Sequence, residues 1–216
     1  MKIYLVRHGL TNTNKERRYV GWGDAALAEQ GYQQAERLGR RFAAEPVAGL
    51  YCSDLLRTLE TAAPIGRIHG LEPVPTRLLR EIHFGRWEGL TYQEMSLEEQ
   101  DALWKWYEDP FLFAPPGGET LTEVYTRAWS FLQPLLEAEK DGEAHVIVTH
   151  GGVIRSLLYR IMKLGLDQLW ELSVENASVS LLQRLQQRVD IAYYNDRSHL
   201  EEEPRAAGDE PLEAGK

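Results

Sequence analysis

Two short apolar runs lie far apart in the chain, and each one leads into a polar turn that contains His-Gly. Ile3 to Val6 is followed by Arg7-His8-Gly9, and Val146 to Val148 is followed by Thr149-His150-Gly151-Gly152. Short runs rich in strand formers and closed by such turns predict buried parallel strands. The sequence therefore predicts two core strands whose ends carry polar side chains.

Helical patterns alternate with these runs. Leu50 to Cys52 is a weaker third strand, and the helical patterns cover Ala28 to Ala44, Leu55 to Ile68 and Glu119 to Glu139. In the first of them the apolar residues recur at helical spacing, as on one face of an amphipathic helix. Alternation of strand and helix predicts an α/β fold with a mainly parallel sheet.

The length of 216 residues is typical of one domain, which we assign to residues 1–196. Within it, the stretch from about 90 to 116 is rich in tryptophan and proline and lacks a strand pattern, so we interpret it as a helical lid. Two late strands are expected at Ser178 to Leu185 and Arg188 to Tyr193, with Gln186-Gln187 as the turn. Residues 197–216 are rich in Glu, Pro, Ala and Gly and predict an acidic, mobile C-terminal tail.

The charge and the cysteine content limit the partners and the compartment. The formal net charge is -9, of which residues 201–216 contribute -4, so we expect neither nucleic-acid nor anionic-membrane binding. No segment reaches the roughly 18 continuous apolar residues of a membrane span. Cys52 is the only cysteine, which excludes an intrachain disulfide and indicates a cytoplasmic protein. We leave a homodimer open.

The two histidines are expected to share one cleft. In open parallel sheets, ligands bind beyond the carboxyl ends of the strands, which is where His8 and His150 would lie. A neutral imidazole is a competent nucleophile near neutral pH, and the planar guanidinium of Arg7 or Arg57 suits phosphate oxygens. Phosphoryl transfer also needs an acid for the departing oxygen, and Glu81 is a candidate.

Each of these residues alone also has a structural interpretation. His150 could be a hydrogen-bonded core histidine, and Glu81 could be a surface acid paired with Arg80. Arg57 could lie on a solvated helix face or pair with Glu60. Their combination is more specific than any single member.

The chain resembles the histidine phosphatase superfamily, also called phosphoglycerate mutase-like, over Lys2 to about Leu182. The resemblance rests on six motifs in order: Val6-Arg7-His8-Gly9 with Thr11 and Asn14; Gly21-Trp22-Gly23-Asp24; Tyr51 to Thr58; Leu79 to Gly89; Pro116 to Thr120; and Val148 to Val153. It implies a three-layer α/β/α sandwich with a helical lid. One position departs from the family pattern, because Leu10 stands where Glu or Gln usually follows Arg-His-Gly, and this puts the substrate preference in doubt.

The resemblance also implies roles for individual residues. His8 would attack phosphorus, and Glu81 would protonate the leaving oxygen and then activate water, so we expect Glu81 to be partly buried. The phosphate would be held by Arg7, Arg57, Asn14 and His150, with Thr11 and backbone amides near Gly21 and Gly151 completing the cradle.

The expected activity is that of a metal-independent phosphomonoesterase without cofactor, acting on a small phosphorylated metabolite. Candidate substrates are alpha-ribazole 5'-phosphate, phosphoglycerate and sugar phosphates. The alternatives are a bisphosphoglycerate-dependent phosphoglycerate mutase and a non-catalytic phosphate-binding protein.

The compact segment Phe84 to Gly89 favours hydrolysis over mutation, since the mutase branch has an added basic, aromatic segment there. A metal hydrolase is disfavoured, because no His-Glu-x-x-His or paired-Cys spacing occurs. Arg17 or Arg18 could meet a second anionic group, and His83 is interpreted as a lid contact.

Overall fold

The computed structural model describes residues 1–138, 142–185 and 188–201. In these ranges, one six-stranded sheet has the strand order β3-β2-β4-β1-β5-β6. The neighbours from β3 to β1 pair in parallel, whereas β5 and β6 are antiparallel additions. The strands are β1 (Lys2–Arg7), β2 (Val47–Ser53), β3 (Val74–Thr76), β4 (Ala144–Thr149), β5 (Val179–Leu185) and β6 (Arg188–Asp196). The expected mainly parallel α/β sheet is confirmed.

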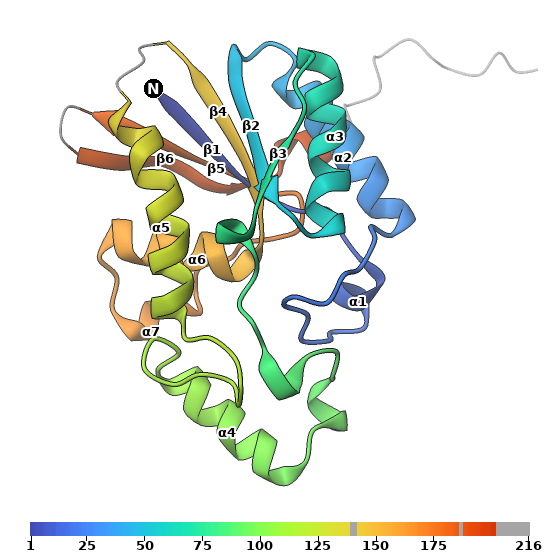
Figure 1. Ribbon diagram of the computed structural model, residues 1–216, viewed down its shortest axis with the longest axis vertical. Coiled ribbons are helices and arrows are strands. Elements are labelled where there is room, and N and C mark those ends of the chain that lie inside the picture. Colours follow the sequence, from blue (N-terminus) through green and yellow to red (C-terminus); the bar gives the residue numbers. More distant parts are fainter. Residues whose placement is uncertain (139–141, 186–187, 202–216) are drawn as a thin grey trace, which may run out of the picture.

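Helices cover both faces of the sheet, so that the molecule has three layers (Figure 1). One face carries α2 and α3, and the other carries α5 and α6. The α-helices are α1 (Asn12–Lys15), α2 (Glu29–Phe42), α3 (Leu56–His69), α4 (Leu97–Glu108), α5 (Leu121–Glu137), α6 (Gly151–Met162) and α7 (Leu166–Leu169). Short 3-10 helices span Arg77–Leu79, Gly85–Trp87, Tyr92–Glu94 and Ser198–Leu200. None of the helices in the described ranges is long and apolar enough to span a bilayer.

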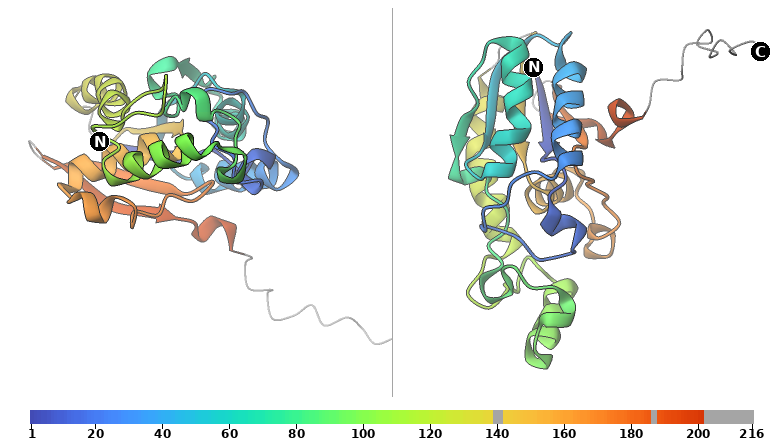
Figure 2. Two further views of the ribbon diagram at one scale, coloured as in Figure 1. Left: turned by 90° about the horizontal axis from the view of Figure 1, so that it is seen from below. Right: turned by 90° about the vertical axis from the view of Figure 1, so that its right-hand side faces the viewer.

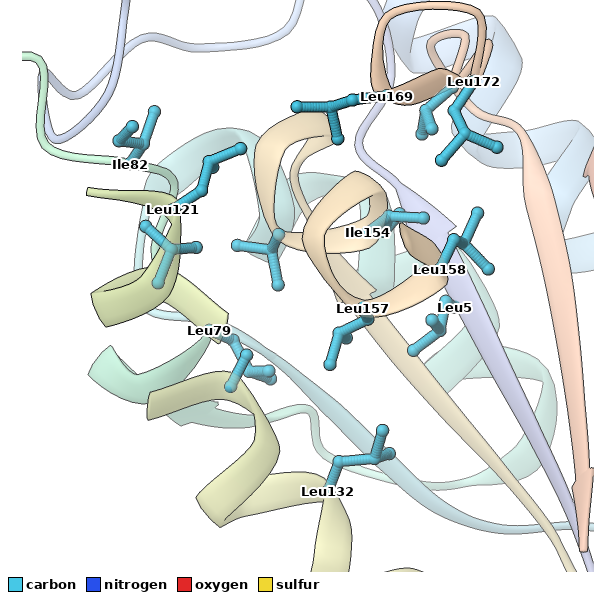
Figure 3. Packing of buried hydrophobic residues seen from close by; sticks show 14 of the residues in the cluster. Leu5, Leu79, Ile82, Leu121, Leu132, Ile154, Leu157, Leu158, Leu169 and Leu172 are labelled. Carbon is cyan, nitrogen blue, oxygen red and sulfur yellow. The ribbon is translucent and has the colours of Figure 1, made fainter. Parts of the chain in front are cut away.

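The strand β1 is apolar along its length because both of its faces are covered. Ile3 and Leu5 belong to the core between the sheet and α5 and α6, whereas Tyr4 and Val6 belong to the core against α2 and α3. Figure 3 shows Leu5 beside Leu158 of α6. This two-sided burial is the physical reason for the continuous apolar runs in the sequence.

Two of the three predicted helices are a few residues shorter in the structure, and the one expected at Leu55 to Ile68 lies at Leu56–His69. The pattern from 119 to 139 becomes α5 at Leu121, because the Thr120 hydroxyl accepts a bond from the Glu123 amide while the Glu123 carboxylate accepts from Thr120. The short strand β3 was missed, since its three residues include Pro75 and show no apolar pattern. The two late strands are present, and the predicted turn at 186–187 lies outside the described residues.

The lid segment lies beyond the carboxyl ends of the parallel strands, as Figure 2 shows for α4. Its capping box at Ser96 and Glu99 defines the start of that helix. Trp106 is buried among Phe84, Trp87 and Trp170 and ties the segment to the body.

The folded part extends beyond residue 196, where we expected the tail to begin. Ser198–Leu200 forms a 3-10 helix, and Leu200 packs against the core that contains Leu38 and Phe42. Arg37 donates to the Leu200 carbonyl at 2.6 Å. Residues 197–201 are therefore part of the domain, and residues 202–216 lie outside the described residues.

Candidate active site

His8 lies in the turn after β1 and lines a cavity at the carboxyl ends of the strands. Its backbone amide donates to the Thr149 carbonyl at 3.0 Å, which fixes the turn against β4. Its Nδ1 lies 2.7 Å from the Gly9 carbonyl oxygen. A carbonyl only accepts, so Nδ1 carries the proton and Nε2 keeps its lone pair when the ring is neutral.

Burial keeps the His8 ring neutral. Desolvation, together with the positive charges of Arg57 and Arg7, holds the pKa of His8 well below its usual 6.5. At neutral pH the ring is an uncharged imidazole with an available Nε2, which is the form that acts as a nucleophile.

Gly9 is required where the His8 turn touches α2. A Cβ at Gly9 would lie 2.7 Å from the Gly31 carbonyl oxygen, closer than real Cβ atoms come to backbone. The two backbones therefore pack directly on each other, which anchors the nucleophile turn to the helix layer.

His150 is the N-cap residue of α6 and is completely buried. Its ring centroid lies 5.2 Å from that of His8, in an edge-to-face arrangement. Neither ring nitrogen has a hydrogen-bond partner in the described part of the chain. Burial and the nearby Arg57 hold the pKa of His150 well below its usual value, so this ring is neutral too. Unpartnered buried polar groups are uncommon and costly, so the His150 ring is suited to bind a ligand atom.

Arg57 is buried and Arg7 is half-buried, and both supply positive charge. Arg7 lines the cavity, donates through Nη1 to the Val174 carbonyl, and has a buried Nε without a partner among the described residues. Arg57 is 2 % exposed and donates from Nη1 to the Gly23 carbonyl at 2.9 Å and from Nη2 to the Gly21 carbonyl at 2.7 Å. Arg57 thus shapes the loop of Gly21 and Gly23 as well as the field at both histidines.

Glu81 lines the same cavity and is half-buried, as expected. Its Oε1 accepts from the Ile82 amide at 2.9 Å, and its Oε2 accepts from the Gly152 amide at 3.1 Å. The Gly152 amide belongs to the first turn of α6, where a helix favours negative charge. A Cβ at Gly152 would lie 2.4 Å from Glu81 Oε1, so only glycine allows this contact.

Asn14 and Gly151 also line the cavity. The Oδ1 of Asn14 accepts from the Thr11 amide at 3.2 Å and from Asn176 Nδ2 at 3.0 Å. Gly151 is the first residue of α6, and the amides of that turn lack helical partners of their own. Both residues are therefore placed to donate to an anion.

Two expected contacts differ in the structure. Thr11 is fully buried as the N-cap of α1, where its hydroxyl accepts from the Asn14 amide at 3.1 Å, so it positions Asn14 and does not line the cavity. The Gly21 amide donates to Glu88 Oε1 at 2.9 Å and is not directed to a ligand. The expectation for Gly21 was wrong because Glu88, which the sequence did not single out, accepts from this loop.

Arg155 is a charged residue of the cavity that the sequence interpretation missed. It lies on α6 four residues after Gly151, and this spacing puts both residues on one face of a helix. The four-residue spacing from Gly151 could therefore have identified Arg155 from the sequence.

The other flagged residues have structural partners. Arg18 lines the cavity but pairs with Glu16 at 2.6 Å and Glu94 at 2.7 Å, whereas Arg17 is exposed. His83 packs against Trp22 with a centroid distance of 4.6 Å. In the described ranges, no group of three or more His, Cys, Asp or Glu side chains is arranged to hold a metal ion.

Comparison with known proteins agrees with this geometry. The family model for the histidine phosphatase superfamily (branch 1) matches residues 3–197. The chain is 38 % identical to phosphoglycerate mutase-like protein 4 of Arabidopsis thaliana over 205 residues, covering 93 % of this chain and 87 % of that protein. It is 30 % identical to phosphoserine phosphatase 1 of Hydrogenobacter thermophilus over 202 residues, covering 94 % and 95 % of the two chains.

The solved structures extend the agreement to three dimensions. The Bacillus stearothermophilus protein YhfR superposes with a TM-score of 0.85 at 36 % identity, over 93 % of this chain and 99 % of that one. A buried neutral imidazole, the cations Arg7 and Arg57, which form no ion pair among the described residues, and a family match over residues 3–197 lead to one conclusion. The chain belongs to branch 1 of the histidine phosphatase superfamily and is a phosphoric monoester hydrolase.

Proposed function

We propose that the protein hydrolyses small phosphomonoesters without a metal ion, through a phosphohistidine on His8. The observation that carries this proposal is the neutral His8 ring, whose Nδ1 is held by the Gly9 carbonyl. Beside it lie the half-buried Arg7, the buried Arg57 and His150, whose ring nitrogens have no hydrogen-bond partner among the described residues. A phosphate dianion would neutralise these charges and give the His150 ring a hydrogen-bond partner.

The reaction divides into two displacements. In the first, His8 Nε2 forms a bond to phosphorus while the bond to the leaving oxygen breaks, and protonated Glu81 gives its proton to that oxygen. In the second, water attacks phosphorus, Glu81 takes a proton from it, and the bond to Nε2 breaks to release inorganic phosphate. The two steps restore both residues.

Hydrolysis is favoured over mutation by the segment that follows Glu81. Gly85–Trp87 closes within one 3-10 turn, and the chain then returns to Tyr19 through paired backbone bonds with Gly89 and Leu90. This compact loop lacks the basic, aromatic insertion that distinguishes the mutase branch. The complete set of nucleophile, acid and phosphate-binding groups argues against a non-catalytic binding protein.

The proposed substrate is a small phosphorylated metabolite. Aromatic side chains also line the cavity, including Trp106 and Trp170. Alpha-ribazole 5'-phosphate, phosphoglycerate and sugar phosphates are the candidates, and the phosphoserine phosphatase relative adds phosphoserine. The buried Cys52 supports a cytoplasmic location, which cell fractionation would test.

The test is hydrolysis of p-nitrophenyl phosphate and a panel of metabolite phosphates with chelator present, in wild type, His8→Ala and the matched control His83→Ala. We expect chelator-resistant turnover in wild type and His83→Ala, and none in His8→Ala. During turnover, acid-labile and base-stable label should be trapped on His8. Chelator-sensitive turnover, or full activity in His8→Ala, would contradict the proposal. A strict requirement for bisphosphoglycerate would identify a mutase.

A further inference from the structure

The cavity contains one more cation, the half-buried Arg155 on α6, whose guanidinium is hydrogen-bonded along one edge. Its Nε and Nη2 both point to the Leu172 carbonyl oxygen, at 3.3 Å and 3.2 Å. The guanidinium carbon lies 5.4 Å from the centroid of the Trp170 ring. Nε and Nη2 form one edge of the planar guanidinium, and this edge is bonded to Leu172. The end formed by Nη1 and Nη2 still has N–H groups that can donate to a ligand.

No carboxylate forms an ion pair with Arg155 within the described ranges. The acids whose charges reach it are Glu81 and Glu175. Glu81 uses its oxygens for the amides of Ile82 and Gly152, and Glu175 is exposed to solvent. Burial lowers the pKa of Arg155, and the negative charges near it offset this only in part. Charges withdrawn from water are normally paired, so this half-buried guanidinium is suited to an anion that arrives with the substrate.

Arg155 is also held next to Arg7. The Leu172 carbonyl accepts from Arg155, and two residues later the Val174 carbonyl accepts from Arg7. Burial lowers the pKa of Arg7, and the charge of Arg155 lowers it further. Two neighbouring half-buried cations repel each other, and anions bound at both would relieve the repulsion.

Arg155 differs from Arg18 because it forms no ion pair among the described residues and can therefore bind a substrate anion. Arg18 lines the same cavity but is neutralised by Glu16 and Glu94. A phosphate on His8 would be met by Arg7, His150 and the α6 amides, which leaves Arg155 for a second group of the substrate.

We propose that Arg155 is a specificity-determining residue that binds a carboxylate of the substrate, beside the phosphate held at Arg7 and His8. The preferred substrates are then phosphomonoesters of small hydroxy or amino acids, with the carboxylate a few bonds from the phosphate. The inference rests on the proposed phosphatase function and adds the chemistry of the leaving group.

The test compares matched substrates that differ in the carboxylate: phosphoserine with phosphoethanolamine, and 3-phosphoglycerate with glycerol 3-phosphate. The variants are Arg155→Gln and Arg155→Lys, with Arg160→Gln on the same helix as the control, because Arg160 lies outside the cavity over Phe111 and Tyr125. Wild type and Arg160→Gln should prefer the carboxylate-bearing member of each pair. Arg155→Gln should lose roughly 10- to 100-fold in kcat/KM for that member relative to its partner, mainly through KM. Arg155→Lys should retain part of the preference.

Three outcomes separate the possibilities. A fall in Arg155→Gln that is equal for both members of a pair would overturn the inference, since the residue would then act on the phosphate or on the fold. The absence of a carboxylate preference in wild type would overturn it as well. His8-dependent turnover of p-nitrophenyl phosphate shows in each case that the phosphatase function itself stands, and its absence would mean that the proposed function has failed.

Discussion

His8 and His150 are 3 % and 0 % exposed, and their chemistry follows from that burial. Burial removes the water that would stabilise an imidazolium, and Arg57 and Arg7 add to the cost of a further positive charge. A free histidine is partly protonated near its usual pKa of 6.5, whereas these two rings remain neutral well below that pH. A neutral ring can act as the nucleophile, which is the proposed role of His8. A neutral ring can also donate a hydrogen bond to phosphate, which is the proposed role of His150.

This burial predicts a pH dependence of stability. Since the folded pKa values lie below the unfolded value of 6.5, the unfolded chain takes up protons first as the pH falls. The free energy of unfolding of the ligand-free protein should therefore be independent of these rings above about pH 7 and should decrease below about 6.5, by about 1 kcal/mol per ring by pH 5.5. Urea unfolding at several pH values would measure it. His150→Gln should give a smaller decrease over this range, and an unchanged slope in that variant would contradict the assignment.

The acid role of Glu81 predicts an effect that depends on the leaving group. Glu81→Gln keeps the shape of the side chain but cannot supply a proton, so kcat for alkyl phosphates should fall about 10²- to 10⁴-fold. Aryl phosphates, whose leaving groups need little protonation, should lose much less. Steady-state rates on both substrate types give the comparison. An equally steep loss on the two would mean that Glu81 is not the proton donor.

At the scale of elements, the site is assembled from the end of β1 and the start of α6. The strand delivers Arg7 and His8, and the helix delivers Gly151, Gly152 and Arg155. Because β1 pairs with β4 in parallel, from Lys2 opposite Ala144 to Arg7 opposite Thr149, both strands end at the same level of the sheet. This register is what brings His8 and His150 into ring contact.

The contact between α6 and Glu81 predicts that Gly152→Ala misplaces the acid. The new Cβ would lie 2.4 Å from Glu81 Oε1, so the carboxylate must move away from the Gly152 amide. We expect kcat for alkyl phosphates to fall by about tenfold or more, because catalytic groups depend on placement within fractions of an ångström. The double variant with Glu81→Gln is the control. If the loss acts through Glu81, the double variant should be little worse than Glu81→Gln alone, and additive losses would contradict this reading.

A clamp outside the cavity supports the same acid. Arg127 of α5 donates to the backbone carbonyls of Leu78, Arg80 and Glu81 and pairs with Glu119 at 2.9 Å. Glu119 in turn accepts from the His83 amide at 3.0 Å. The ion pair between Arg127 and Glu119 thus holds the segment that carries the acid. Arg127 bonds the carbonyls of Leu78 and Arg80 before Glu81, and Glu119 bonds the His83 amide after it.

At the scale of the whole molecule, the last element of the described chain is the 3-10 helix Ser198–Leu200, which is docked on α2. Arg37 of α2 donates to the Leu200 carbonyl, and Arg41 of α2 donates to Ser198 Oγ at 3.3 Å and also bonds Asp196 and Tyr193 of β6. The helix layer and the end of the described chain therefore stabilise each other at a site away from the catalytic cavity.

Truncation should show where the domain ends. Removal of residues 202–216 should leave kcat/KM and the unfolding midpoint unchanged. Removal from Arg197 onward should lower the free energy of unfolding by about 1 to 3 kcal/mol, since the buried contacts of Leu200 and the bond from Arg37 are lost. Thermal and urea unfolding of the two truncated proteins gives the comparison. Equal stability of both would place the end of the domain at residue 196.

The sequence by itself determined the strand ends, the alternation of layers and the main participants. Apolar runs covered on both faces have no alternative to a buried sheet, so Ile3 to Val6 and Val146 to Val148 could be read directly. The motif residues His8, Arg7, Glu81, Asn14 and Gly151 all line one cavity, and the buried His150 contacts His8.

Only the tertiary structure decided how the neighbouring groups are used. Glu88 accepts from the Gly21 amide, Thr11 caps α1, and Arg155 forms no ion pair within the described part of the chain. A sequence cannot show which polar groups meet across distant loops. Local patterns arise from neighbours along the chain, and they are readable. Hydrogen-bond partners and burial arise from contacts between segments far apart in sequence, and they depend on the folded arrangement.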